Sequence, residues 1–224
     1  MDVLEKIDEA LSARKEKKRD YLGASGIGAP CQRKTWYDFH RERNIPPRIQ
    51  RIFDLGHAIE DCVKRWLRDA GLLIEGRKLN FIYPDNDKIR GHLDCFIEYN
   101  GCIYIVDIKT CKHSSFLSFK RDGLRKWSPT YFSQLQMYMG LSKIKHAMIL
   151  AIDKDTSEMH YEIIKYDEII FDELVTKGEA ILSYDYPPDR IHHSPTYYLC
   201  RRCNHIKECH GSKETTKAVP EKST

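Results

Sequence analysis

The chain has 224 residues, 41% of them apolar and 11% aromatic, which is enough to build a core and excludes a disordered chain. Lysine and arginine (37) outnumber aspartate and glutamate (33) by only four, so net charge alone does not indicate a nucleic-acid-binding protein. The longest clean apolar run, residues 147–152, is far too short to span a membrane, and the N-terminus has no signal-peptide pattern. We therefore expect a cytoplasmic protein without a membrane partner.

The order of the predicted elements indicates one mixed α/β domain with an N-terminal extension. Residues 1–20 have the apolar spacing of an amphipathic helix, and residues 211–224 have the composition of a disordered polar tail. The span 21–210 forms the main domain. Within it we expect helices near 47–70, 128–141 and 167–183, and strands near 72–83, 89–99, 102–109, 145–153 and 158–166. This order predicts a central mixed sheet flanked by helices.

A predicted hairpin places two aspartates next to each other. Residues 100–101 are Asn-Gly, the preferred centre of a two-residue type I′ turn. The register set by that turn puts Asp94 directly opposite Asp107, with their Cβ atoms about 5 Å apart. Lys109 lies two residues beyond Asp107, and its side chain therefore projects from the same face.

Two carboxylates at this separation repel each other by about 3 kcal/mol, taking ~5 Å and an effective dielectric constant of ~20. A divalent cation between them removes that cost, and oxygen ligands suit Mg²⁺ or Mn²⁺. The alternative is that both aspartates point into water while Lys109 neutralises one of them. Because Phe96, Ile103 and Ile105 share the face, full exposure is disfavoured.

A third metal ligand is expected on the helix near 47–70. Its segment Gly56-His-Ala-Ile-Glu60 offers two candidates, His57 and Glu60. On a helical wheel Glu60 lies about 60° from the centre of the apolar stripe and His57 about 120° away. A carboxylate near the buried side needs a cation or another partner. Glu60 is therefore the favoured ligand and His57 the less favoured one.

The helix near 128–141 carries a polar pair. Gln134 and Tyr138 are four residues apart and so share one helical face. Both side chains could contact a phosphate or a base, but this spacing alone is equally typical of a boundary stripe between core and solvent.

Three of the eight cysteines gather in a polar segment, where packing gives them no reason to cluster: Cys200, Cys203 and Cys209. A structural Zn²⁺ site completed by His205 or His210 is one interpretation. An iron–sulfur cluster completed by Cys31 is the other. The remaining cysteines lie in apolar stretches and are expected to be small buried hydrophobes: Cys62, Cys95, Cys102 and Cys111.

Taken in order over about residues 21–145, the motifs resemble the RecB-like branch of the PD-(D/E)XK nucleases: Gly56-x-x-x-Glu60, Gly91-x-x-Asp94, Asp107-x-Lys109 and Gln134-x-x-x-Tyr138. Two positions depart from the commonest pattern. RecB-type members often have His where this chain has Glu60, which is instead similar to phage-type exonucleases. Glu is also common at the position of Asp107.

The resemblance implies a restriction-endonuclease-like fold and a metal-dependent DNA exonuclease that acts on DNA ends or single strands. It implies that Lys109 orients or activates the attacking water and that Gln134 and Tyr138 position the DNA strand. The implied ligands of Mg²⁺ or Mn²⁺ are Glu60, Asp94, Asp107 and the backbone carbonyl of Ile108, with His57 as the alternative.

The cysteines extend the resemblance. One Cys before the nuclease core and three after it are similar to the iron-staple nucleases, namely the CRISPR-associated RecB-like exonucleases and the AddB nuclease domain. This similarity implies that Cys31, Cys200, Cys203 and Cys209 bind a 4Fe–4S cluster, with Zn²⁺ as the alternative. The implied partners are DNA and proteins of recombination, repair or CRISPR adaptation, in a bacterial or phage-infected cell.

Two rival functions remain from other classes. One is a non-catalytic DNA-binding or adaptor protein that keeps the fold, which would have no need of Asp94, Asp107 and Lys109 together. The other is a redox protein built on the cluster, although nothing resembles a site for a partner cofactor. Two basic groups are expected to line a DNA path: Arg41, Arg43, Arg48 and Arg51, and Lys120, Arg121, Arg125 and Lys126.

Overall fold

The computed structural model describes residues 2–14, 18–42, 45–75 and 79–211. The tail expected over 211–224 therefore lies, apart from Gly211, outside the described residues. In chain order the elements are α1 (Val3–Ser12), β1 (Leu22–Gly23), α2 (Ala24–Ile27), α3 (Gln32–His40), α4 (Pro47–Asp69), β2 (Leu73–Glu75), β3 (Leu79–Tyr83), β4 (Asn86–Leu93), β5 (Cys95–Tyr99), β6 (Cys102–Cys111), α5 (His113–Asp122), α6 (Leu124–Trp127), α7 (Pro129–Ser142), β7 (His146–Asp153), β8 (Met159–Lys165), α8 (Glu168–Ser183) and α9 (Ile206–His210).

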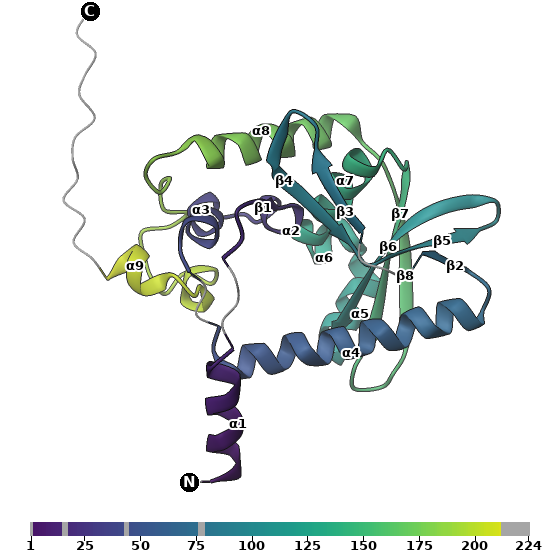
Figure 1. The fold of residues 1–224 in the computed structure, drawn as a ribbon, viewed down its shortest axis with the longest axis horizontal. Coiled ribbons are helices and arrows are strands. Elements are labelled where there is room, and N and C mark those ends of the chain that lie inside the picture. The colour runs from purple at the N-terminus through teal and green to yellow at the C-terminus, as the bar shows by residue number, and fades with distance from the viewer. Residues whose placement is uncertain (1, 15–17, 43–44, 76–78, 212–224) are drawn as a thin grey trace, which may run out of the picture.

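The predicted mixed α/β class is confirmed, but the strands form two mixed sheets where one central sheet was expected. The larger sheet has the order β2-β5-β6-β7-β8, in which β6 and β7 are parallel and the other neighbours antiparallel. The smaller sheet has the order β1-β4-β3. Figure 1 shows α4 running along one side of the larger sheet and α8 on the opposite side of the molecule, while α1 projects away from the body.

Buried apolar side chains pack on both faces of the larger sheet. Because side chains alternate along a strand, Ile105 on β6 joins the cluster under α7, whereas Val106 faces α4 and contacts the cluster that contains Val63. Helix α8 packs closely on α7 at Gly140, where an added Cβ would lie 2.1 Å from the ring of Phe171. The sheet is thus covered by α4 on one face and by α7 on the other.

The predicted hairpin is confirmed. Asn100 and Gly101 both have positive φ, 51° and 72°, as a type I′ turn requires. The pairing runs from Tyr99↔Cys102 to Cys95↔Val106 in the predicted register. The strand expected over 89–99, however, is interrupted at Asp94, so that β4 belongs to the smaller sheet and β5 to the larger one.

Local signals located the three longest helices, α4, α7 and α8. Helix α7 begins after Ser128, whose Oγ accepts the Tyr131 N–H, and α8 begins after Asp167, whose carboxylate accepts two N–H groups. The helix expected over 1–20 is shorter, because α1 ends at Ser12. Helices α5 and α6 were not anticipated. Among the described residues, no helix has both the length and the apolar sequence that a bilayer crossing needs.

Candidate active site

The site lies where one side of β6 has no partner strand. Pairing with β5 stops at Cys95↔Val106, whereas pairing with β7 continues to Cys111. Beyond Val106 the β5 side of β6 therefore opens onto a cavity, which we call the β6 cavity. Its lining includes side chains from α4, from the break between β4 and β5, from β6 and from α7: Glu60, Asp94, Lys109, Gln134 and Tyr138.

The two aspartates meet β6 in different ways. Asp94 stands at the strand break, and its Oδ2 accepts the backbone N–H of Ile108 at 3.0 Å. The Asp94 carboxylate thus takes the place of a neighbouring strand. Asp107 is 1% exposed on β6, and its Oδ1 accepts a hydrogen bond from Gln134. Asp94 sits outside the β5–β6 ladder, so it does not pair directly opposite Asp107 as the register predicted. Its side chain instead contacts the backbone N–H of Ile108.

Burial and mutual repulsion govern the charges of these carboxyl groups. Burial, followed by the charge of Asp107, raises the pKa of Asp94 to about 7. Burial also raises the pKa of Asp107, against the opposing effect of Lys109. Burial alone would lower the pKa of Lys109, but the charges of Asp107 and Asp94 raise it above its usual range. Lys109 therefore stays protonated beside two carboxyl groups whose ionisation is costly.

Lys109 is held by two contacts. Its Nζ lies 2.6 Å from Asp107 Oδ2 and 4.9 Å from the centre of the Tyr131 ring. Although this ion pair is short, the buried Oδ2 of Asp107 accepts no hydrogen bond of regular geometry from the described residues. This oxygen is therefore paired in charge with Lys109 but lacks a regular hydrogen bond, which makes it a candidate ligand for a metal ion.

The structure brings Glu60 to the β6 cavity as a buried residue. Its Oε1 lies 2.5 Å from Nζ of Lys64, one helical turn further along α4. His57 also lines the cavity, but its side chain is exposed. The helical-wheel expectation that Glu60 is the more buried of the two agrees with this arrangement.

Gln134 and Tyr138 are both buried and face the carboxylates. The Nε2 of Gln134 donates to Asp107 Oδ1 at 2.9 Å and to the Tyr138 hydroxyl at 2.6 Å. Burial, followed by the charge of Asp107, raises the pKa of the Tyr138 phenol, so it remains neutral. The side-chain hydrogen bonds described for these two residues are to Asp107 and to each other.

The donor set fits a hard divalent cation. Glu60, Asp94 and Ile108 line the cavity, and the buried Asp107 contacts Lys109 and Gln134 of the same lining, so three carboxylates and one backbone carbonyl offer the oxygen ligands that suit Mg²⁺ or Mn²⁺. In the described part of the chain no three His, Cys, Asp or Glu side chains stand close enough together to hold a metal ion in their present positions. Glu60 in particular is turned to Lys64.

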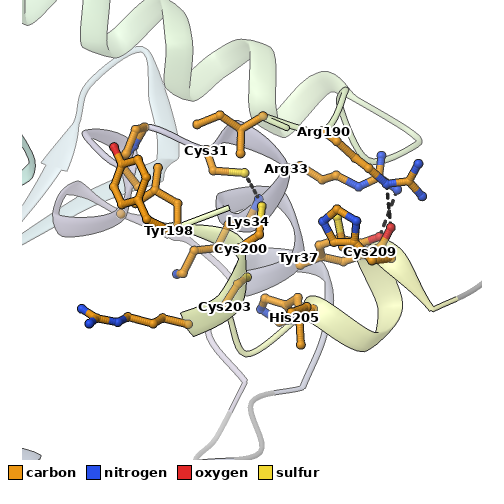
Figure 2. Close-up of a pocket in the computed structure, with 18 of the residues that line it drawn as sticks. Cys31, Arg33, Lys34, Tyr37, Arg190, Tyr198, Cys200, Cys203, His205 and Cys209 are labelled. Carbon is orange, nitrogen blue, oxygen red and sulfur yellow. Dashed lines mark hydrogen bonds between the residues drawn. The ribbon is translucent and has the colours of Figure 1, made fainter. Parts of the chain in front are cut away.

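The four cysteines that were expected to bind a cluster all line one pocket, which is different from the β6 cavity and is shown in Figure 2. Cys31 caps the start of α3, where its Sγ accepts the Lys34 N–H at 3.4 Å, and the other three come from the C-terminal segment. Burial, followed by the nearby thiols of Cys209 and Cys31, raises the pKa of Cys200. Segments from both ends of the chain therefore meet at one group of thiols.

The two histidines considered as zinc ligands differ in their contacts. His205 Nε2 is 3.0 Å from Asp38 Oδ1, and the His205 ring stacks on Tyr37, so this side chain is already engaged. His210 Nε2 is buried and has no hydrogen-bond partner among the described residues. Of the two, His210 has the nitrogen that is available for a ligand.

Several residues of the cavity, and one that pairs with its lining, were not anticipated from the sequence. Lys64 pairs with Glu60 but does not line the cavity, whereas Arg19 lines it together with Lys109. The Tyr21 hydroxyl lies 2.6 Å from His92 Nε2 at the same cavity. His92 stands inside the Gly91–Asp94 motif, which was the one available signal for it.

No described residue of the two basic groups expected along a DNA path lines this cavity. Lys120 pairs with Glu158 at 3.6 Å, and Asp122 pairs with Arg121 and Lys126. Arg51 pairs with Asp8, and Arg43 lies outside the described residues. These contacts are those of solvated surface pairs.

The sequence matches no protein-family model and no curated protein. Solved structures do share its fold. The alkaline exonuclease LHK-Exo from Laribacter hongkongensis matches with a TM-score of 0.55 at 15% identity, over 80% of this chain and 91% of that one. The same enzyme in complex with dAMP gives 0.56 at 14%, over the same shares. A protein designated SSO0001 gives 0.50 at 18%, over 99% of this chain and 95% of that one.

Proposed function

We propose that this protein is a metal-dependent exonuclease that hydrolyses phosphodiester bonds at DNA ends or in single strands. The observation that carries the proposal is the convergence of Asp94, Asp107 and Lys109 at the open side of β6. The fold is that of the alkaline exonuclease LHK-Exo, one of whose structures contains a deoxynucleotide, dAMP. Two buried carboxylates with raised pKa values stabilise a fold less than two uncharged side chains would, so their presence points to a functional role.

The proposed ligands of Mg²⁺ or Mn²⁺ are Asp94, Asp107, Glu60 and the backbone carbonyl of Ile108. When bound, the ion would polarise the scissile phosphate and lower the pKa of a coordinated water. Lys109 keeps a positive charge beside the reacting phosphate, because Asp107 and Tyr131 fix its ammonium group. Gln134 holds the Asp107 carboxylate in orientation. His57, which is exposed, is the less favoured ligand.

We also propose a 4Fe–4S cluster on Cys31, Cys200, Cys203 and Cys209. Supporting it, the four thiols line one pocket, and the backbone N–H of Lys34 already donates to the Cys31 sulfur. Such hydrogen bonds are typical of cluster-bound thiolates. A cluster here would join α3 to the C-terminal segment and so stabilise the domain. The alternative is Zn²⁺ bound by Cys200, Cys203, Cys209 and His210.

The main rival is a DNA-binding or adaptor protein without catalysis, working with recombination, repair or CRISPR-adaptation proteins. It is disfavoured because a binding surface gains nothing from buried carboxylates, which repel the phosphate backbone. A redox protein is disfavoured because the β6 cavity has the lining of a hydrolytic site.

The test is digestion of end-labelled single-stranded and double-stranded DNA in Mg²⁺, Mn²⁺ or EDTA, with Asp107→Ala as the control against contaminating nuclease. We expect cleavage from ends with either metal, none in EDTA and none with the variant. The matched control is Glu98→Gln, an exposed carboxylate on the same hairpin, which should cleave at the normal rate. Full activity of Asp107→Ala would overturn the proposal.

A further inference from the structure

Lys64 is a buried cation that pairs with a proposed metal ligand, Glu60, without itself lining the β6 cavity. It lies on α4 one turn after Glu60, and its Nζ is 2.5 Å from Glu60 Oε1. Both side chains are nearly buried, with 8% of the Lys64 side chain and 11% of the Glu60 side chain exposed. A surface i,i+4 pair contributes little to stability, but a buried lysine without an anion would be strongly disfavoured.

The charges around the β6 cavity explain why a lysine is placed there. Among the buried and partly buried groups, three carboxylates, those of Glu60, Asp94 and Asp107, are opposed by two ammonium groups, those of Lys64 and Lys109. Arg19 also lines the cavity but is left out of this count, because it is exposed and solvent screens its charge. The fully ionised centre therefore carries one net negative charge. Glu60 is part of this field, since its charge contributes to the raised pKa of both aspartates. Without Lys64 the metal-free centre would hold two uncompensated negative charges.

The same count limits what the centre can bind. One divalent cation would change its net charge from one negative to one positive. A second divalent cation would then approach a positive site and would also have to displace Lys64 from Glu60 Oε1. Because Oε1 of Glu60 is paired with Lys64, the other carboxylate oxygen, Oε2, is the atom through which Glu60 would bind a metal ion.

We propose that Lys64 is the resident counter-ion of Glu60, which withholds Oε1 from metals and restricts the centre to a single divalent ion. This inference rests on the proposed function, because it requires that the β6 cavity is a metal centre. Lys64 acts through Glu60 and is a positioning residue. It keeps the metal-free centre folded, and it weakens metal binding relative to a centre with the same carboxylates and no lysine.

The test is Mn²⁺ binding, measured as the loss of the free-ion electron paramagnetic resonance signal during titration of the protein. Lys64→Gln keeps a hydrogen-bond donor for Glu60 but removes the charge, and Lys64→Arg keeps the charge. Asp107→Asn identifies ions bound elsewhere, including at the cysteines, and its binding is subtracted. Metal-free melting temperature is recorded for every variant.

The wild type and Lys64→Arg should bind one Mn²⁺ that Asp107→Asn does not bind. Lys64→Gln should bind Mn²⁺ about tenfold more tightly or better, because a nearby positive charge is gone, and should accept a second ion. Its metal-free melting temperature should fall. A purely structural role predicts the opposite, namely weaker Mn²⁺ binding in a damaged site.

Unchanged or weaker binding by Lys64→Gln, or two ions in the wild type, would overturn the inference while leaving the nuclease proposal intact. If the wild type binds no more Mn²⁺ than Asp107→Asn does, the proposed metal centre itself is overturned. If Lys64→Gln does not fold, the double variant Glu60→Gln/Lys64→Met replaces the pair with uncharged side chains. If this double variant folds, the unpaired charge of Glu60 is the reason that Lys64→Gln does not fold. If the double variant also fails to fold, Lys64 is needed only for packing.

Discussion

Gln134 donates a 2.9 Å hydrogen bond from its side-chain Nε2 to Oδ1 of Asp107, so a residue of α7 fixes the orientation of a buried carboxylate on β6. The second hydrogen of the same amide goes to the Tyr138 hydroxyl. Both N–H groups of the Gln134 amide are therefore used, one by the proposed metal ligand Asp107 and the other by Tyr138. A residue that the sequence motif connects with DNA is, in its contacts, a support for Asp107.

Replacing this amide should slow catalysis more than it weakens DNA binding. In Gln134→Leu, Asp107 Oδ1 loses its donor, and losses of such outer contacts to metal ligands lower affinity or activity by about 10–100-fold. We expect a loss of that size in the cleavage rate, with DNA affinity in Ca²⁺ little changed. Gln136→Leu is the matched control, since Gln136 is buried on the same helix but donates to Lys165 O. Equal losses for both variants would contradict this role.

Glu60→Gln and His57→Ala should differ sharply. Glu60 is buried at the cavity and His57 is exposed, so only the first has a position suited to a metal ligand. We expect Glu60→Gln to raise strongly the Mn²⁺ concentration needed for half-maximal cleavage, and His57→Ala to change it slightly. The reverse ranking would identify the histidine as the ligand.

Metal should stabilise the protein more at high pH than at low pH. The pKa of Asp94 is raised from 3.8 to about 7 by burial and Asp107, so its protonated form stabilises the metal-free fold at low pH. That contribution is lost as the pH rises through about 7, where the carboxylate becomes available to a cation. We expect saturating Mg²⁺ to raise the melting temperature more at about pH 8 than at about pH 5.5.

In that experiment Asp107→Asn provides the control. It removes one of the repelling charges, so its metal-free form should melt at the same or a higher temperature than the wild type at high pH. Mg²⁺ should not shift it. A metal-induced shift of equal size at both pH values in the wild type would argue against the carboxylates as the binding groups.

The cysteine pocket makes a separate prediction. Protein purified without oxygen should be brown, with about four irons per chain and broad absorbance of thiolate-bound iron. Cys203→Ser should lose iron and solubility. Cys102→Ser, which changes a hairpin cysteine that was expected to be buried but is exposed, should lose neither. Colourless protein that holds one Zn²⁺ and has a free Cys31 thiol would exclude the cluster and leave the nuclease proposal standing.

Features with a local cause were predictable from the sequence. The turn at residues 100–101 and the helix start at Ser128 depend on residues within one or two positions, and both were located correctly. The strand break at Asp94 depends on the Ile108 N–H, which is far along the chain. Lys64 is similar, because its burial follows from how α4 packs and not from its own helical position.

Helices α5 and α6 were missed for a different reason. Only Phe116, Phe119 and Leu124 of residues 113–127 are buried, so the apolar periodicity is too sparse to identify a helix. These side chains pack into the main core from a segment that is mostly polar and basic. Sequence pattern alone therefore predicted the right class of fold and which side chains meet at the β6 cavity, but not helices α5 and α6.

The open side of β6 has a consequence for the protein as a solute. An unpaired strand edge in the middle of a sheet can accept a strand from another molecule and so start aggregation. Here Asp94 covers the Ile108 N–H and Lys109 places a charge at the same edge, which discourages that pairing. Substitutions that disable the proposed chemistry at Asp94 thereby also remove a safeguard against self-association, whereas those at Asp107, whose side chain is buried, leave the edge protected.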